Sequence, residues 1–248
     1  MKTVLNAFYF ALSYFSTIPV FVKNMEINNE TYKYTLALLP LVGAIISTLV
    51  IVLNLGLNEL FNPLYASFIS AVVYLALYGF LHLEAVCDVV DAWFASHGGK
   101  DAYKIMKEPT IGAIGALYTF SFVLLKVGAI TYLLYEQQYV LFFIICMFSR
   151  LNFIYLLGYF KFAKDSFLSL AFQDAGVGKV KLFSLLYIVF ALFIGSYVLV
   201  LLFVSLLSFY LILKKLDKQF GFVNGDCLGF TLEHVELILL NLALALVV

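Results

Sequence analysis

The sequence predicts an all-α, polytopic integral membrane protein with about six to seven transmembrane helices. Of its 248 residues, 64% are hydrophobic and only 12% are charged, whereas a soluble domain carries about a quarter charged residues. The mean hydropathy of +1.04 agrees with this class. The formal net charge is zero, so the composition predicts no nucleic-acid partner and indicates a lipid bilayer as the environment.

Apolar stretches separated by short polar segments define the expected spans. We place them at residues 34–55, 64–81, 112–135, 139–160, 180–195, 197–213 and 228–248. At about 1.5 Å per residue, the run over 180–213 is far longer than one crossing needs, so we expect two spans that turn near Gly195–Ser196. Residues 4–22 are interrupted by polar residues and by Pro19. They predict either a short span or an N-terminal helix that is interfacial or re-entrant, and we favour the second.

The lysines are distributed unequally between the two sides that these spans define. The opposite loops carry only Glu59 and Glu136 as charged residues. Because cytoplasmic loops carry the excess of Lys and Arg, the sequence predicts a multi-pass protein of the cytoplasmic (inner) membrane. Residues 82–111 would then face the cytoplasm, unless residues 180–213 cross only once. The loop lysines all lie on one side, in segments 23–33, 82–111, 161–179 and 214–226 and at Lys181.

The segment Leu81–Trp93 (LHLEAVCDVVDAW) carries three carboxylates on one helical face. Glu84, Asp88 and Asp91 are spaced i, i+4 and i+7, which stacks them along a helix. Like charges so placed repel each other, so we expect a cation between them. Clustered oxygen ligands suit Mg²⁺, which typically joins one or two carboxylates to substrate phosphates. The alternative is a helix end that only contacts lipid headgroups.

The last predicted span adds three further acidic residues. Asp226 and Glu233 are seven residues apart and share a face, and Glu236 follows near it. Ionisable groups inside a span are costly and usually functional. For Glu233 and Glu236 the alternative is an ion pair with Arg150 or Lys126.

Cations suited to an anionic substrate occur between these acidic segments. A short helix over 101–108 would set Lys104 and Lys107 on one face, and Gly112 and Gly115 open the next span. A glycine-bearing helix N-terminus is a ready anion site. Lysines in a loop that are merely solvated are the alternative. Metal-held phosphates, lysines and an acidic base together suggest phosphoryl or phosphodiester transfer.

Three further polar residues lie in or beside the predicted spans. For two of them the sequence leaves a functional and a structural role open. Arg150 lies deep in a span, where it binds a phosphate or forms a structural ion pair. His82 is a base or a supporting group, or it is simply interfacial. Lys126 is expected to extend its amine toward the membrane surface.

These motifs resemble the adenosylcobinamide-GDP ribazoletransferase (cobalamin 5′-phosphate synthase) family. The residues from Leu81 to Asp91 are similar to its HLDGxxDxxDA signature. Residues 11–19 and 39–43 also resemble the family's opening, so the resemblance covers essentially the whole chain. Further matching stretches follow in the family's order: Ile105–Lys107, Ile111–Gly115, Ser149–Arg150, and Gly225–Gly229 with Glu233 and Glu236.

The resemblance implies one membrane-embedded catalytic domain over residues 1–248. Its substrates would be adenosylcobinamide-GDP and α-ribazole or α-ribazole 5′-phosphate, and GMP would leave. The resemblance does not decide between a monomer and a homo-oligomer. The implied metal ligands for Mg²⁺ are Glu84, Asp88, Asp91 and Asp226. The implied catalytic groups are Asp91, Asp226 and His82. The implied substrate contacts are Lys104, Lys107, Gly112, Gly115 and Arg150.

Two departures from the family pattern affect these roles. Glu84-Ala85 stands where the family has Asp-Gly, which keeps the carboxylate but lengthens its reach. Glu108-Pro109-Thr110 replaces an Asp-Ser-Arg-like step, which removes an arginine that would contact phosphate. A CDP-alcohol phosphotransferase is the second reading, although no arginine follows Asp88 at that family's position. A cation-coupled transporter is the third, although transporters favour inverted repeats with midplane sites.

Overall fold

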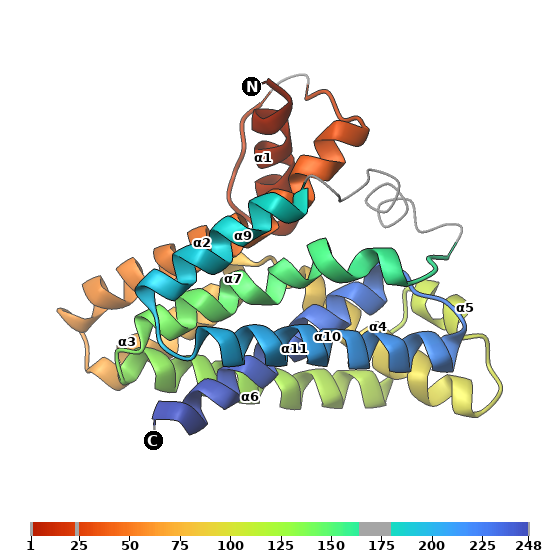
Figure 1. Ribbon diagram of the computed structural model, residues 1–248. Helices are drawn as coiled ribbons and strands as arrows, with labels where there is room; N and C mark the ends of the chain where they lie inside the picture. Colours follow the sequence, from red (N-terminus) through yellow and green to blue (C-terminus); the bar gives the residue numbers. More distant parts are fainter. Residues whose placement is uncertain (1, 23–24, 164–179, 248) are drawn as a thin grey trace.

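The computed structural model describes residues 2–22, 25–163 and 180–247, and the regular secondary structure of this part of the chain is helical, with one isolated bridge between Phe162 and Val223 (Figure 1). The all-α prediction is therefore confirmed. The helices are α1 (Lys2–Phe15), α2 (Asn29–Asn58), α3 (Pro63–Leu77), α4 (Leu81–His97), α5 (Ala102–Lys107), α6 (Ala113–Tyr135), α7 (Tyr139–Leu156), the 3-10 turn η1 (Leu157–Tyr159), α9 (Val180–Ile194), α10 (Val198–Phe220) and α11 (Gly225–Val247).

Five of the described helical segments are long and apolar enough to cross a membrane. They are α2, α6, α7 with η1, α10 and α11, and the bent pair α3 and α4 gives a sixth if it is one span. α9 is a shorter apolar helix of 15 residues. This agrees with a polytopic membrane protein. The N-terminal helix α1 has 14 residues, fewer than the ~20 that a crossing requires, as the sequence indicated.

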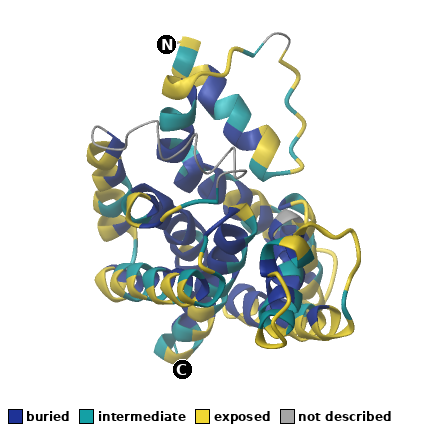
Figure 2. Cartoon of the chain, turned by 90° about the vertical axis from the view of Figure 1, so that its right-hand side faces the viewer, coloured by how far each residue is buried: buried dark blue, intermediate teal, exposed yellow. Residues whose placement is uncertain are grey.

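The centre of the bundle is α7. Almost every residue from Leu141 to Ile154 is buried, because α2, α6, α9, α10 and α11 all pack around it (Figure 2). α2 approaches α7 so closely that a Cβ on Gly43 would lie 2.2 Å from the Cys146 carbonyl oxygen. Glycine is therefore required at this crossing.

The structure corrects the expected continuation of the 64–81 span into the acidic segment. α3 ends at Leu77, and Gly79 and Phe80 follow with positive φ angles of 71° and 55°. α4 leaves at 76° to α3. The C-terminal turn of α3 is capped by the N-terminal segment, since Thr17 donates its backbone N–H to the Leu77 carbonyl at 2.9 Å. The acidic segment is thus a separate helix.

The other expected break is present. The apolar run over 180–213 forms α9 and α10, which are separated at Gly195–Tyr197. A side chain at position 195 would meet Ile144 on α7, since a Cβ there would lie 2.4 Å from its Cδ1 atom. Most of the expected loop at 161–179 lies outside the described residues, which resume at Val180. Lys23 of the expected loop at 23–33 also lies outside them. The bundle nevertheless has two distinct ends, with α4, α5 and the start of α11 at one of them (Figure 1).

Candidate active site

A cavity of about 980 Å³ lies at the end of the bundle where α4, α5, α6 and α11 meet. Three of the predicted acidic residues line it, namely Glu84 and Asp88 from α4 and Asp226 from the first turn of α11. Lys107, the last residue of α5, also lines it. The structure therefore brings together residues that are more than a hundred positions apart in the sequence.

Asp226 and Lys107 form an ion pair at the edge of α5 and α11 that lines this cavity. The Lys107 Nζ atom lies 3.2 Å from Asp226 Oδ2, and the lysine side chain remains 55% exposed. Burial lowers the pKa of Lys107, but Asp226, with Tyr103 and Asp88, raises it, and the net pKa lies above the usual value. The lysine therefore stays cationic at neutral pH. Asp88 in turn experiences the negative charges of Asp226, Glu84 and Asp91, so the cavity concentrates negative charge.

Asn224 orients Asp226, a role that the sequence analysis missed. Its side-chain oxygen accepts the Cys227 backbone N–H at 2.9 Å and so caps α11. Its amide nitrogen donates to Asp226 Oδ2 at 2.9 Å. The signal in the sequence was an Asn two residues before an Asp at the start of an apolar helix, which is a capping pattern.

Asp91 does not line the cavity as Glu84 and Asp88 do, and its carboxylate contacts the start of α6. Its Oδ2 atom accepts the Gly112 backbone N–H at 2.7 Å, and its Oδ1 atom accepts that of Gly115 at 2.8 Å. The predicted anion site at this helix N-terminus therefore holds a carboxylate of the chain itself. Lys104, the other lysine expected at the site, is exposed on α5, while the cavity is lined by Lys107.

His82 is buried in the first turn of α4 and is not among the residues that line the cavity. Its ring packs edge-on against Tyr78, with 5.1 Å between ring centroids. On its other side is Gly229 of α11, where a Cβ would come within 3.2 Å of His82 Nδ1. This position is a helix–helix contact between α4 and α11.

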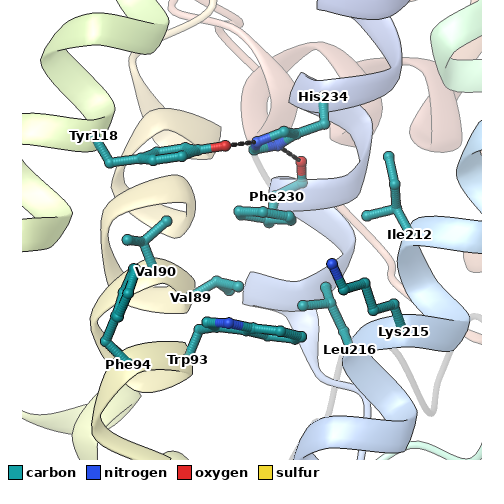
Figure 3. Close-up of a pocket in the computed structure, with 10 residues that line it drawn as sticks. All are labelled: Val89, Val90, Trp93, Phe94, Tyr118, Ile212, Lys215, Leu216, Phe230 and His234. Atoms are coloured by element: carbon teal, nitrogen blue, oxygen red, sulfur yellow. Dashed lines mark hydrogen bonds between the residues drawn. The ribbon is translucent and has the colours of Figure 1, made fainter. Parts of the chain in front are cut away.

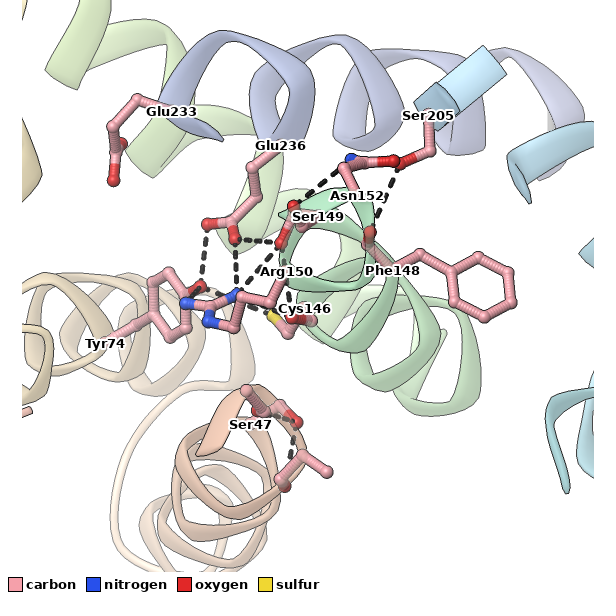
Figure 4. Close-up of polar contacts among 12 residues, drawn as sticks. Ser47, Tyr74, Cys146, Phe148, Ser149, Arg150, Asn152, Ser205, Glu233 and Glu236 are labelled. Atoms are coloured by element: carbon pink, nitrogen blue, oxygen red, sulfur yellow. Dashed lines mark hydrogen bonds and ion pairs between the residues drawn. The ribbon is translucent and has the colours of Figure 1, made fainter. Parts of the chain in front are cut away.

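Arg150 lies in a buried ion-pair network between α3, α6, α7 and α11 (Figure 4). Its Nη1 atom is 2.9 Å from Glu236 Oε2, and its side chain is 3% exposed. Tyr74 donates to the same carboxylate at 2.7 Å. Of the two readings of Arg150, the structural ion pair is the one formed here, and it is also the alternative reading given for Glu236.

Lys126 belongs to this network, and its expected position at the membrane surface is wrong. Its Nζ atom lies 2.6 Å from Glu233 Oε2 and 2.8 Å from Glu236 Oε1, with all three side chains fully buried. The physical reason is that two glutamates one helical turn apart on α11 need two cations, and Arg150 supplies only one.

Comparisons with known proteins bear on what this site does. A family profile described as cobalamin-5-phosphate synthase matches residues 7–244. The chain belongs to the cobalamin-5-phosphate synthase family. Curated proteins named adenosylcobinamide-GDP ribazoletransferase are similar over nearly their full lengths. One from Treponema denticola is 28% identical over 96% of both chains, and one from Clostridium perfringens is 31% identical over 95% of this chain and 96% of its own.

A further relative of that name, from Pseudomonas syringae, is 28% identical over 96% of this chain and 98% of its own. No solved structure matches this member of the cobalamin-5-phosphate synthase family. The family is one of transferases, and the phospholipid-forming and transporter readings are not favoured. Because the match spans nearly the whole chain, it includes all the helices that form the cavity.

The carboxylates that line the cavity do not form a complete set of protein ligands for a metal ion. In the part of the chain that the structure describes, no group of three or more His, Cys, Asp or Glu side chains is close enough to hold a metal ion. Glu84, Asp88 and Asp226 nevertheless line one cavity with an excess of negative charge. Mg²⁺ binds through one or two carboxylates plus substrate phosphates, so this donor set fits an ion that arrives with a phosphorylated substrate.

A second pocket of about 360 Å³ lies between α4, α6, α10 and α11 (Figure 3). Trp93 and Phe230 form its walls, and Tyr118 hydrogen-bonds His234 at 2.8 Å on one side. The Lys215 amine lies 5.1 Å from the Trp93 ring centroid. It contains no carboxylate among its described lining residues. The acidic cavity is therefore the candidate active site of this transferase-family chain.

Proposed function

We propose that this chain transfers the adenosylcobinamide-phosphate group of adenosylcobinamide-GDP to α-ribazole or α-ribazole 5′-phosphate. The products are adenosylcobalamin, or its 5′-phosphate, and GMP. The observation that carries the proposal is the acidic cavity bounded by Glu84, Asp88 and Asp226 with Lys107, in a chain that matches the family from residue 7 to 244.

A ribose hydroxyl of α-ribazole attacks the phosphorus on the cobinamide side of the pyrophosphate. The new P–O bond forms as the bond to the oxygen that GMP retains is broken. The hydroxyl proton passes to a carboxylate of the cavity, for which Asp226 is our choice. Of the three predicted catalytic groups, Asp226 is the one that lines the cavity, and Asn224 orients it. Lys107 offsets the charge of the departing phosphate.

Glu84 and Asp88 are the residues that would hold Mg²⁺ together with the substrate pyrophosphate, and Asp226 would complete the ligand set only if another carboxylate took the proton. When bound, the ion supplies charge neutralisation at the phosphate oxygens. The carboxylates alone would repel a pyrophosphate, which is why a cation is needed in a cavity of this charge. We place the protein in the cytoplasmic (inner) membrane with this cavity facing the cytoplasm, on the strength of the lysine asymmetry.

The test is an assay with purified protein in detergent. It is incubated with adenosylcobinamide-GDP, either form of α-ribazole and Mg²⁺, and GMP and the cobalamin product are quantified. We expect product formation that EDTA abolishes and excess Mg²⁺ restores. Asp88→Asn should lower kcat by about 100-fold or more, because it removes a charge at the reacting phosphates. Glu59→Gln changes an exposed glutamate at the far end of the bundle and should leave turnover unchanged.

Absence of product with either acceptor would contradict the proposed reaction. Full Mg²⁺-dependent activity in Asp88→Asn would contradict the metal assignment alone. A parallel incubation with CDP-diacylglycerol and an alcohol acceptor tests the phospholipid reading, for which CMP release would be the positive result.

A further inference from the structure

Both carboxylate oxygens of Asp91 are engaged by the backbone of α6. Gly112 donates to Oδ2 at 2.7 Å and Gly115 donates to Oδ1 at 2.8 Å. The Cys87 thiol is 3.9 Å from Oδ2, a third and weak contact. A carboxylate that accepts two backbone N–H groups at a helix N-terminus satisfies donors that the helix itself leaves unpaired, and it complements the positive end of the helix.

A side chain at either glycine would collide with this carboxylate. A Cβ on Gly112 would lie 2.3 Å from Asp91 Oδ1, and the three nearest heavy atoms that it would meet all belong to Asp91. A Cβ on Gly115 would lie 2.5 Å from Asp91 Oδ2 and 2.7 Å from the Cys87 carbonyl oxygen. The closest obstacle to a side chain at position 112 is therefore the Asp91 carboxylate. Position 115 is glycine because of the α4 backbone as well.

Asp91 differs in this from its neighbours on α4. Glu84 and Asp88 line the acidic cavity, whereas Asp91 is not one of its lining residues. On α6 the cavity is lined by Ala116, Thr119 and Phe120, from the turns that follow the Asp91 contact, so α4 and α6 each form a wall of it. The distance between the two walls depends on how α4 is attached to the start of α6.

We propose that Asp91 is a positioning residue and neither a metal ligand nor the general base. It occupies the anion site at the start of α6, so the phosphates of the substrate do not bind to the Gly112 and Gly115 amides. It also fixes α4 against α6, which holds Glu84 and Asp88 on one wall of the cavity. The statement that Asp91 does not bind the metal rests on the proposed function. The statement that Asp91 attaches α4 to α6 does not.

A double-mutant cycle on thermal unfolding of the purified full-length protein tests the attachment. Asp91→Ala and Gly112→Ala should each lower the unfolding temperature by about 2 °C or more, since each removes or displaces a helix cap. In the Asp91→Ala background, Gly112→Ala should not lower the unfolding temperature further, because the Asp91 carboxylate atoms nearest to the new Cβ are absent. Gly115→Ala is the matched control, because it still meets the Cys87 carbonyl and should lower the temperature in both backgrounds.

Additive losses for Asp91→Ala and Gly112→Ala would overturn the attachment. Asp91→Asn keeps one acceptor oxygen, so its unfolding temperature should lie between those of Asp91→Ala and the unsubstituted protein. An unfolding temperature of Asp91→Asn no higher than that of Asp91→Ala would also contradict the proposal.

Binding of Mn²⁺ as a probe, followed by electron paramagnetic resonance, separates positioning from ligation. Measured with adenosylcobinamide-GDP present, Asp88→Asn should weaken Mn²⁺ binding by about tenfold or more, while Asp91→Asn should change it by less than about twofold. Asp91→Asn should still lower kcat while leaving the Mg²⁺ concentration at half-maximal rate unchanged. Equal weakening in both variants would make Asp91 a ligand and overturn the assignment. If no variant bound Mn²⁺ or formed product, the proposed function would fail, and the unfolding cycle would still decide the role of Asp91.

Discussion

Lys126 has no exposed surface, although it carries a charge inside a helix that is apolar enough to span a membrane. Its amine lies between Glu233 and Glu236, and Arg150 neutralises the second carboxylate. The network is balanced, with two cations and two anions. Among the described residues, Glu233 Oε1 is one of the few buried polar atoms that accept no hydrogen bond. Glu233 therefore depends on Lys126 more than Glu236 does.

We predict that Lys126→Met lowers stability severely, by about 3–5 kcal/mol, because it leaves a buried carboxylate without a cation. Adding Glu233→Gln to Lys126→Met should recover part of this loss, since Glu236 keeps Arg150. Thermal unfolding in detergent measures both effects. Lys214→Met, at an exposed lysine near the end of α10, is the control and should have little effect. A double variant less stable than Lys126→Met alone would contradict this account.

The sequence predicted which residue types would meet at the acidic cavity, but not how each is used. Helical spacing placed Glu84, Asp88 and Asp91 on one face, and the structure keeps Glu84 and Asp88 at one cavity. Asp91 could not be separated from them by spacing, because its partners are backbone amides on another helix. Lys126 was misplaced for the same reason, since its partners on α11 lie more than a hundred residues away. Spacing is a local property, and these contacts are tertiary.

At the scale of helices, close crossings decide the arrangement. α2 meets α7 at Gly43, where a Cβ would lie 2.2 Å from the Cys146 carbonyl and 2.9 Å from Arg150 Cδ. The same contact sets the position of Arg150, which pairs with Glu236 on α11. α2, α7 and α11 therefore meet at Arg150.

We predict that Gly43→Ala destabilises the protein by about 1–3 kcal/mol, because α2 and α7 must move apart. Gly56→Ala on the same helix is a matched control, since a Cβ there meets nothing within 4 Å. It should be neutral or stabilising, as alanine favours the helix by about 0.5–1 kcal/mol over glycine. The two unfolding temperatures give the comparison. Equal effects would show that the crossing at Gly43 tolerates a side chain.

Element boundaries were predictable where the chain itself breaks the helix, as at Gly195. The break between α3 and α4 was missed because it depends on distant contacts. Thr17 caps the end of α3, with its hydroxyl 3.2 Å from the Ala76 and Leu77 carbonyls as well as its N–H on Leu77. Nothing within residues 64–93 indicates that partner. The glycine at 79 is the one local signal, and an isolated glycine in an apolar run is also common within a span.

At the scale of the whole molecule, the bundle separates two ends of different charge. The helix ends at 58–63, 136–138 and 195–197 gather at one end (Figure 1), where the charged residues are Glu59 and Glu136. The other end contains α4, α5 and the junction of α10 with α11, with Lys107, Lys214, Lys215 and Lys218. The acidic cavity opens at the lysine-bearing end, so orientation in the membrane determines which compartment supplies the substrates.

We predict that the lysine-bearing end faces the cytoplasm, because positively charged segments are retained on that side. Single cysteines introduced by Glu59→Cys, Glu136→Cys and Lys218→Cys report on the two ends, since all three positions are exposed. In intact cells with a permeabilised outer membrane, an impermeant maleimide should label positions 59 and 136 only. In inverted inner-membrane vesicles it should label position 218 only. The native cysteines are buried, so labelling of the unsubstituted protein should be weak and serves as the background. They are Cys87, Cys146 and Cys227. Labelling of position 218 in intact cells would place the cavity outside the cytoplasm, where a nucleotide-activated substrate is not available to it, and would contradict the proposed orientation.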